Sequence, residues 1–211
     1  MSTNRTIDHI VYAVPNLEEA INWFENRSGI RPIIGGKHAK QGTKNALVNL
    51  GDACYLELIT VDTENTNINT PRWMGVDLLN GQSKTTRWSL KSNDLESDSQ
   101  IIKAYDPEMG VIHQGQRQTT TGQLLRWQMT LPLAHPQVEL VPFMTDWQHS
   151  DFHPTDKMEE QCQLLALSLY HPKAASIQPT IDALQLDMKV QQKEQIAIEL
   201  SLATPKGVVN I

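Results

Sequence analysis

The chain has 211 residues, a net charge of -6, 39% hydrophobic residues and 20% charged residues. This composition is typical of a globular protein and leaves room for one large or two small domains. It excludes a basic surface for nucleic acid, and no apolar run is long enough to cross a bilayer. The N-terminus lacks the features of a signal peptide, and the two cysteines, Cys54 and Cys162, have no metal-type spacing. We therefore expect a cytoplasmic protein with buried, reduced thiols.

Residues 1–62 predict a first β-α-β-β-β module. An apolar strand, 7–14, ends at Pro15, and Asn16 is placed to cap a helix with one apolar face. Gly29 predicts the end of this helix. The three strands that follow are expected near 32–36, 45–50 and 54–61.

The same order of elements recurs twice. Residues 82–148 predict a second module, with a strand near 85–91, a helix capped by Asn93 or Asp94, and strands at 111–118, 124–131 and 138–144. Residues 160–211 predict a partial third module, in which Pro179 is tolerable only in the first turn of the helix. Such repetition favours an α+β fold built from paired modules.

Two polar residues interrupt the apolar strands of the first module. His9 lies in the first strand and Glu57 in the fourth. A carboxylate is rarely buried without a partner. The pair therefore indicates either a site built across the sheet or a buried hydrogen bond between two strands.

These features resemble the vicinal oxygen chelate superfamily, and several phrases look like its glyoxalase-like domain proteins. The phrases are Ile7-Asp8-His9-Ile10-Val11-Tyr12-Ala13-Val14, Gly35-Gly36-Lys37-His38, Tyr55-Leu56-Glu57-Leu58-Ile59, Gly115-Gln116-Arg117, Leu125-Arg126-Trp127 and Pro142-Phe143-Met144-Thr145-Asp146-Trp147. The resemblance implies paired βαβββ modules in one curved mixed sheet, as in the glyoxalase/dihydroxybiphenyl dioxygenase fold, with the site inside the cup of the sheet.

The resemblance also implies a divalent metal held by one ligand from the first strand and one from the fourth strand of each module. His9 and Glu57 match these positions in the first module. The second module departs from the pattern, because Arg87 aligns with His9, and Val141, Pro142 or Phe143 stands in place of the second acid. None of these side chains chelates a divalent cation.

His38 is the third candidate metal ligand, since it lies in the glycine-rich connection that the resemblance places near the site; it is otherwise a solvent-exposed loop residue. With His9 and Glu57 it would form a two-His, one-carboxylate set suited to Zn, Fe, Ni or Mn.

Arg87 either clamps an anionic substrate group or pairs with Glu57 and removes the metal. Trp88, Arg117 and Trp127 are candidates for substrate binding, with an aromatic core and surface charge as the alternative. We expect His149, His153 and His171 to be solvated loop residues.

The sequence thus predicts a small-molecule enzyme of lyase, isomerase or dioxygenase type, acting on a substrate with vicinal oxygens, in which Glu57 and Arg87 are catalytic. The alternatives are a metal-free binding or resistance-type protein on the same fold, and a scaffold whose own side chains fill the cup. An unpaired sheet edge in the partial third module predicts a homodimer. No nucleic-acid or membrane partner is expected.

Overall fold

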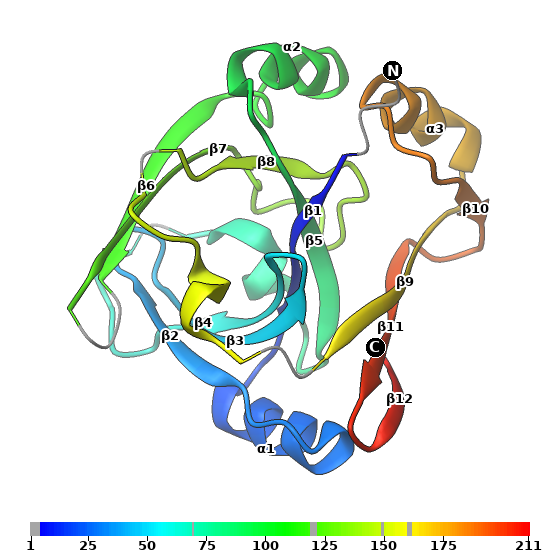
Figure 1. Ribbon diagram of the computed structural model, residues 1–211. Helices are drawn as coiled ribbons and strands as arrows, with labels where there is room; N and C mark the ends of the chain where they lie inside the picture. The colour runs from blue at the N-terminus through cyan, green and yellow to red at the C-terminus, as the bar shows by residue number, and fades with distance from the viewer. Residues whose placement is uncertain (1–4, 69, 119–121, 149, 160–161) are drawn as a thin grey trace.

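The computed structural model describes residues 5–68, 70–118, 122–148, 150–159 and 162–211. Its elements follow the predicted α+β order with short 3-10 helices between modules (Figure 1). In chain order they are β1 Ile7–Ala13, α1 Leu17–Ser28, β2 Ile33–His38, β3 Thr43–Gly51, β4 Cys54–Val61, η1 Trp73–Leu78, β5 Lys84–Lys91, α2 Leu95–Tyr105, β6 Ile112–Gln118, β7 Leu124–Thr130, β8 Phe143–Asp146, η2 Pro154–Lys157, β9 Gln163–His171, α3 Ala174–Ala183, β10 Val190–Gln192, β11 Ala197–Thr204 and β12 Gly207–Asn210.

The first two modules share one curled sheet of eight strands, in the order β2-β3-β4-β1-β5-β8-β7-β6. In each module the first strand pairs in parallel with the fourth, and β1 joins the modules by pairing antiparallel with β5. The sheet curls so far that its edge strands, β2 and β6, approach each other (Figure 1). This confirms the predicted curved mixed sheet.

The first helix forms as its sequence predicts. The Asn16 side chain accepts hydrogen bonds from the backbone N–H of Glu18 and of Glu19, which satisfies two of the free donors at the helix start. The helix ends at Gly29, whose φ of 81° is a left-handed conformation that glycine adopts without strain. In the second module Asp94 caps α2 through Ser97 N–H.

The two faces of the curled sheet carry two separate apolar clusters, because side chains alternate along each strand. The convex face, with Ile10 and Trp88, packs under the helices. The concave face, with Val11 and Trp127, packs inside the cup together with η1. The cup therefore has an apolar floor before any polar side chain is added.

The strand predicted at 138–144 is wrong in its position. The fourth strand of the second module is β8, Phe143–Asp146, and residues 131–142 form the connection in front of it, of which 138–142 are buried. The apolar run Val138–Val141 misled the prediction, because its side chains are buried in the core without strand pairing. Pro142 adds to this break, since proline cannot donate to a strand ladder.

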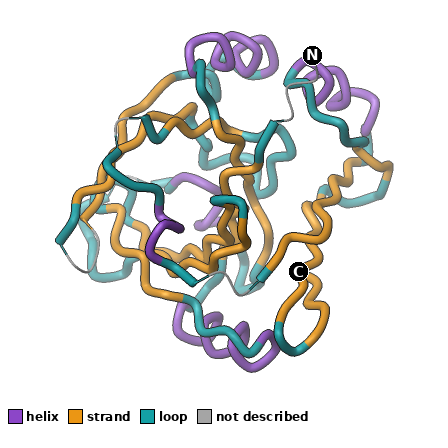
Figure 2. The backbone as a smooth tube through the Cα atoms, in the orientation of Figure 1, coloured by secondary structure: helices purple, strands orange, loops and turns teal. Residues whose placement is uncertain are grey.

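The C-terminal segment repeats the predicted order of elements but not the strand order of the modules. It forms its own four-stranded sheet, β10-β9-β11-β12, in which β9 lies between β10 and β11. Figure 2 shows these strands apart from the strands of the cup. Pro179 lies in the second turn of α3, not in the first as expected, and removes one helical hydrogen bond there. In the described part of the chain, no helix is long and apolar enough to span a membrane.

Candidate functional site

A small cavity lies in the cup at the end of the sheet where β1, β4 and β8 meet. Its polar lining consists mainly of His9, His38, Asn45 and Glu57, and its walls are aromatic or contain methionine. The volume is about 30 Å³, which is room for about two water molecules. The apolar wall comprises Leu47, Tyr55, Trp73, Met74, Trp127, Met129, Phe143, Trp147 and Pro154. The sequence-predicted residues His9, His38, Glu57 and Trp127 therefore lie together.

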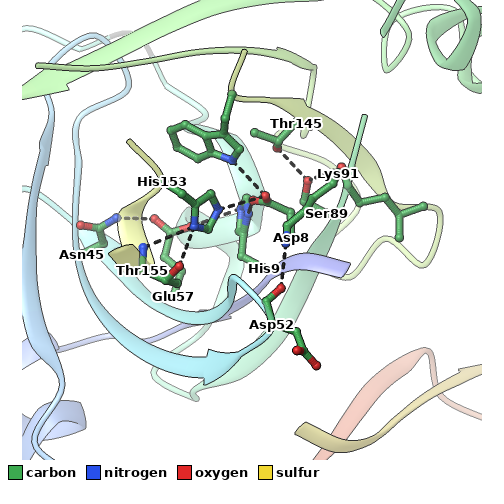
Figure 3. A network of polar contacts seen from close by, with 12 residues as sticks. Asp8, His9, Asn45, Asp52, Glu57, Ser89, Lys91, Thr145, His153 and Thr155 are labelled. Atoms are coloured by element: carbon green, nitrogen blue, oxygen red, sulfur yellow. Dashed lines mark hydrogen bonds and ion pairs between the residues drawn. The ribbon is translucent and has the colours of Figure 1, made fainter. Parts of the chain in front are cut away.

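A β-bulge in the first strand brings two neighbouring polar residues into contact. The pairing of β1 with β5 shifts between Ile7 and His9, so Asp8 is the extra residue. Regular alternation would place Asp8 and His9 on opposite faces of the sheet. With the bulge, the Asp8 carboxylate lies 2.5 Å from His9 Nδ1 (Figure 3).

Asp8 is fully buried, yet it carries its charge. Burial alone would raise the pKa of this carboxyl, but the hydrogen bonds from His153 and His9 outweigh burial and lower the pKa from 3.8 to about 2. Trp147 Nε1 donates a further hydrogen bond of 2.9 Å. A carboxylate only accepts hydrogen bonds, so His9 must carry its proton on Nδ1. In the neutral imidazole the Nε2 atom of His9 is then an acceptor.

Glu57 faces that acceptor across the cavity. Its Oε2 atom lies 3.9 Å from His9 Nε2, and its Oε1 atom accepts a hydrogen bond of 2.5 Å from Asn45 Nδ2 (Figure 3). The Oδ1 atom of Asn45 is buried without a hydrogen-bond partner among the described residues. A Cβ atom on Gly35 would lie 2.3 Å from this oxygen, so the glycine leaves the space that Asn45 needs. An unsatisfied buried amide costs free energy, and such groups are characteristic of functional sites.

His38 completes the polar group from the opposite side of Glu57. Its Nε2 atom lies 4.0 Å from Glu57 Oε1, and its Nδ1 atom lies 3.0 Å from the Thr43 hydroxyl. Trp73 Nε1 donates to the same hydroxyl over 3.1 Å. His38 is buried, so the expectation of an exposed loop histidine does not hold.

The side chains of His9, His38 and Glu57 are of types that bind divalent metals, but the distances between them are longer than in a bound metal site. Two imidazoles and one carboxylate are common ligands of Zn, Fe and Mn, and Asp8, Thr43 and Asn45 hold them as second partners usually hold metal ligands. Two ligands of one tetrahedral ion lie roughly 3.4 Å apart, whereas His9 and His38 lie 3.9 and 4.0 Å from Glu57. Among the described residues, no group of three or more His, Cys, Asp or Glu is close enough to hold a metal.

Strand pairing places two hydroxyls of the second module close to His9. Ser89 pairs with His9 across the two modules, and Thr145 lies in the neighbouring strand β8 and lines the cavity. The hydroxyls of Ser89 and Thr145 lie 2.7 Å apart. The same register pairs Ile10 with Trp88, so it is consistent with the predicted alignment of Arg87 with His9. In that alignment Phe143, which pairs with Ser89, stands in place of the second acid, within the expected 141–143.

Arg87 lies outside the cavity, in contrast to both roles expected for it. Its guanidinium is buried and donates to the carbonyls of four residues, Thr86, Leu133, Pro136 and Gln137, over 2.6–3.1 Å. Burial lowers the pKa of Arg87 to about 10. Among the described contacts it forms neither an ion pair with Glu57 nor a surface for a substrate anion. It fixes the connection 131–142 instead.

Of the remaining substrate-binding candidates, one lines the cavity and one lies in the core. Trp127 lines the cavity, whereas Trp88 belongs to the convex core and donates to Leu140 O over 2.7 Å. The side chain of Arg117 lies outside the described part of the structure. Among the described residues that line the cavity, none is Lys or Arg.

Two site residues come from places where the sequence carries little signal. His153 was expected in a solvated loop, but its Nε2 atom lies 3.3 Å from Asp8 and its ring 5.8 Å from Tyr55. Asp8 was not recognised as a site residue, because the alternation of side chains along the strand places it on the face opposite His9. Of the other two histidines in that prediction, His149 lies outside the described residues, and His171 ends β9 and accepts a hydrogen bond from Lys173 N–H.

The paired modules and the cup define a protein of the vicinal oxygen chelate superfamily. The chain belongs to a family described as "Glyoxalase-like domain", whose model matches residues 7–185. No curated protein matches the chain.

Several solved structures are similar to this chain at low sequence identity. A hypothetical protein from Staphylococcus aureus is 18% identical, with a TM-score of 0.63 over 98% of this chain and 85% of that chain. Methylmalonyl-CoA epimerase from Streptomyces coelicolor, in complex with 2-nitronate-propionyl-CoA, is 18% identical over 71% of this chain and 99% of that chain, with a TM-score of 0.45. The Mycobacterium tuberculosis epimerase is 18% identical over 69% and 90%, with a TM-score of 0.43.

Proposed function

We propose that this chain is a small-molecule enzyme of lyase or isomerase type that moves a proton on a substrate with two neighbouring oxygens. The observation that carries the proposal is the facing pair of proton acceptors, His9 Nε2 and Glu57 Oε2, 3.9 Å apart in an aromatic cavity. This spacing is too long for a hydrogen bond between the two groups, so a substrate group beside them can approach both to about 3 Å.

In this mechanism Glu57 takes a proton from the carbon next to a carbonyl, which leaves an enolate, and then returns the proton to that carbon or to the neighbouring position. His9 Nε2 accepts a hydrogen bond from the hydroxyl next to the carbonyl and so orients the substrate, while Asp8 holds the His9 ring with its proton on Nδ1. Asn45 orients the Glu57 carboxylate. The aromatic walls limit the access of water, which strengthens the electrostatic interactions inside the cavity.

The described lining argues for an uncharged substrate group in the cup. It contains the Glu57 carboxylate but no cation, and the buried carboxylate of Asp8 lies directly behind His9. An anionic group placed there would meet like charge without a compensating partner. Arg117 stays a predicted substrate-binding residue, and an Arg117→Ala variant that loses binding of an anionic substrate would contradict the uncharged assignment.

A second candidate function adds a divalent metal. It is favoured by the two histidines that both direct Nε2 toward Glu57. His9, His38 and Glu57 would hold the ion, which would supply Lewis-acid stabilisation of a substrate oxygen. Metal analysis of the purified protein and of a Glu57→Ala variant tests this candidate: stoichiometric metal that is lost in the variant supports it, and no bound metal in either rejects it.

Proton transfer is tested by NMR, as exchange of the carbon-bound α protons of hydroxyacetone and dihydroxyacetone in D2O. We expect the protein to catalyse this exchange and Glu57→Gln to lower the rate by about 10²–10⁴, the usual contribution of a general acid–base group. Glu64→Gln is the matched control, because Glu64 is exposed and pairs with Lys37. Equal rates in the wild type and Glu57→Gln would reject the mechanism. Binding without exchange would favour the metal-free binding protein.

The homodimer stays a proposal. The four-stranded sheet ends in the short strand β12, where Val208 is 63% exposed and offers an edge to a second copy. Light scattering that gives a monomer at micromolar concentration would contradict it.

A further inference from the structure

A cap lies over part of the mouth of the cavity; we define it as Trp147 together with residues 150–156. Trp147 and Pro154 line the cavity directly, and the Trp147 ring lies 5.5 Å from Trp127 on the opposite wall. The space between these walls holds about two water molecules and is partly open to solvent. A molecule larger than this fits beside His9 and Glu57 only if part of the wall moves.

The cap is attached to the cup through Asp8. Trp147 Nε1 and His153 Nε2 both approach the Oδ2 atom of this carboxylate, at 2.9 and 3.3 Å. The tautomer of His153 fits this role, because its Nδ1 atom accepts a hydrogen bond from Thr155 N–H and its proton must therefore be on Nε2. Figure 3 shows His153 directed at Asp8 from one side and His9 from the other.

The two oxygens of Asp8 are divided between two different tasks. Oδ1 accepts a hydrogen bond from His9 Nδ1–H. Oδ2 accepts hydrogen bonds from the two cap residues, Trp147 and His153. The side chain of Asp8 is 0% exposed. A buried carboxylate that loses two of three donors must find water or rotate, since an unpaired buried charge is costly. Either response disturbs the hydrogen bond that fixes the His9 ring.

We infer that Asp8 is a positioning residue that couples closure of the cap to the orientation of His9. With the cap closed, all three donors hold the carboxylate and His9 directs its Nε2 acceptor at Glu57. With the cap open, Asp8 is hydrated and His9 exchanges between its tautomers. The candidate proton acceptor is then fully oriented only while the cap lies over the cavity.

Two measurements without substrate test this coupling, so its failure is distinguishable from failure of the proposed function. Hydrogen exchange of peptides spanning 150–158 reports cap opening, and ¹⁵N chemical shifts of the His9 ring report its tautomer. In Trp147→Phe and His153→Phe, which leave Asp8 in place, we expect exchange to rise about tenfold. We also expect His9 to lose its single Nδ1–H form. Asp8→Asn should show both effects more strongly.

Ser150→Ala is the matched control, because Ser150 lies in the cap and its hydroxyl accepts only a long bond of 3.5 Å from Arg126 N–H among its described contacts. It should change neither measurement. Faster exchange in both cap variants with an unchanged His9 tautomer would overturn the coupling and leave Asp8 as an anchor for the cap alone. Unchanged hydrogen exchange of peptides 150–158 in both variants would overturn the assignment of Asp8 as the residue that attaches the cap. These two variants decide the matter even if Asp8→Asn does not fold.

Discussion

Replacing Asp8 by asparagine should reduce the loss in the free energy of unfolding that the protein shows as the pH falls from about 4 to about 2. The Asp8 pKa is about 2 in the folded protein and 3.8 in its ordinary state. A carboxyl whose folded pKa is depressed stabilises the fold above its unfolded pKa, and this stabilisation is lost as the pH falls through the folded pKa. The relevant window is therefore about pH 4 to pH 2.

The magnitude follows from the size of the shift. Each pKa unit corresponds to about 1.4 kcal/mol, so a shift of about two units gives roughly 2–3 kcal/mol at pH 7. Asp8 is fully buried, so solvent screening does not reduce this value. In Asp8→Asn the amide nitrogen replaces one carboxylate oxygen and directs N–H donors at the donors of that oxygen, which are His9 on Oδ1 or Trp147 and His153 on Oδ2, and this adds to the loss.

Urea denaturation followed by tryptophan fluorescence at pH 7, 5, 3 and 2 measures the effect. We expect the wild type to exceed Asp8→Asn by at least about 2 kcal/mol at pH 7, and the difference to shrink by about that amount at pH 2. Asp187→Asn is the control, since Asp187 is exposed. A wild-type advantage that is equal at pH 7 and pH 2 would refute the reasoning, because Asp8 would then not titrate between them.

Three further predictions concern the walls of the cup and the core. Arg87→Met should lower the free energy of unfolding by about 3–5 kcal/mol in urea, because four carbonyls, one in a buried contact and three in partly buried contacts, each lose a charged donor; a loss below about 1 kcal/mol would contradict this role. Burial raises the pKa of Cys54 to about 12 and of Cys162 to about 11, so both thiols should react with an aromatic disulfide at pH 8 about a hundredfold more slowly than in urea. A rapid thiol in the native protein would argue against their burial. Gly115→Ala should cost about 1–3 kcal/mol by thermal unfolding, because its Cβ would lie 2.2 Å from the Trp127 ring, and an unchanged midpoint would show that this wall yields.

Much of the fold could be predicted because local signals and repetition agree. The helix caps at Asn16 and Asp94, the glycine stop at Gly29 and the recurrence of the element order all appear in the structure. His9 and Glu57 were recognisable because each interrupts an apolar strand. Such interruptions are visible without knowing how the strands pair.

The other site residues depend on facts that one sequence does not contain. Asp8 shares the environment of His9 only because of a bulge, and strict alternation directs it to the opposite face. His153 reaches Asp8 across 145 positions of the chain. Contacts of this range are set by tertiary packing.

The C-terminal sheet has a consequence for attempts to shorten the protein. Every cup residue named above precedes position 160, so a fragment ending there would contain the whole candidate site. It would also lose Leu169, Leu200 and Leu202, which share one buried cluster with Trp88 on the convex face of the large sheet. Such a fragment would expose an apolar surface and aggregate. The smallest folding unit of this protein is therefore larger than its smallest candidate site, and the intact chain should unfold in one transition.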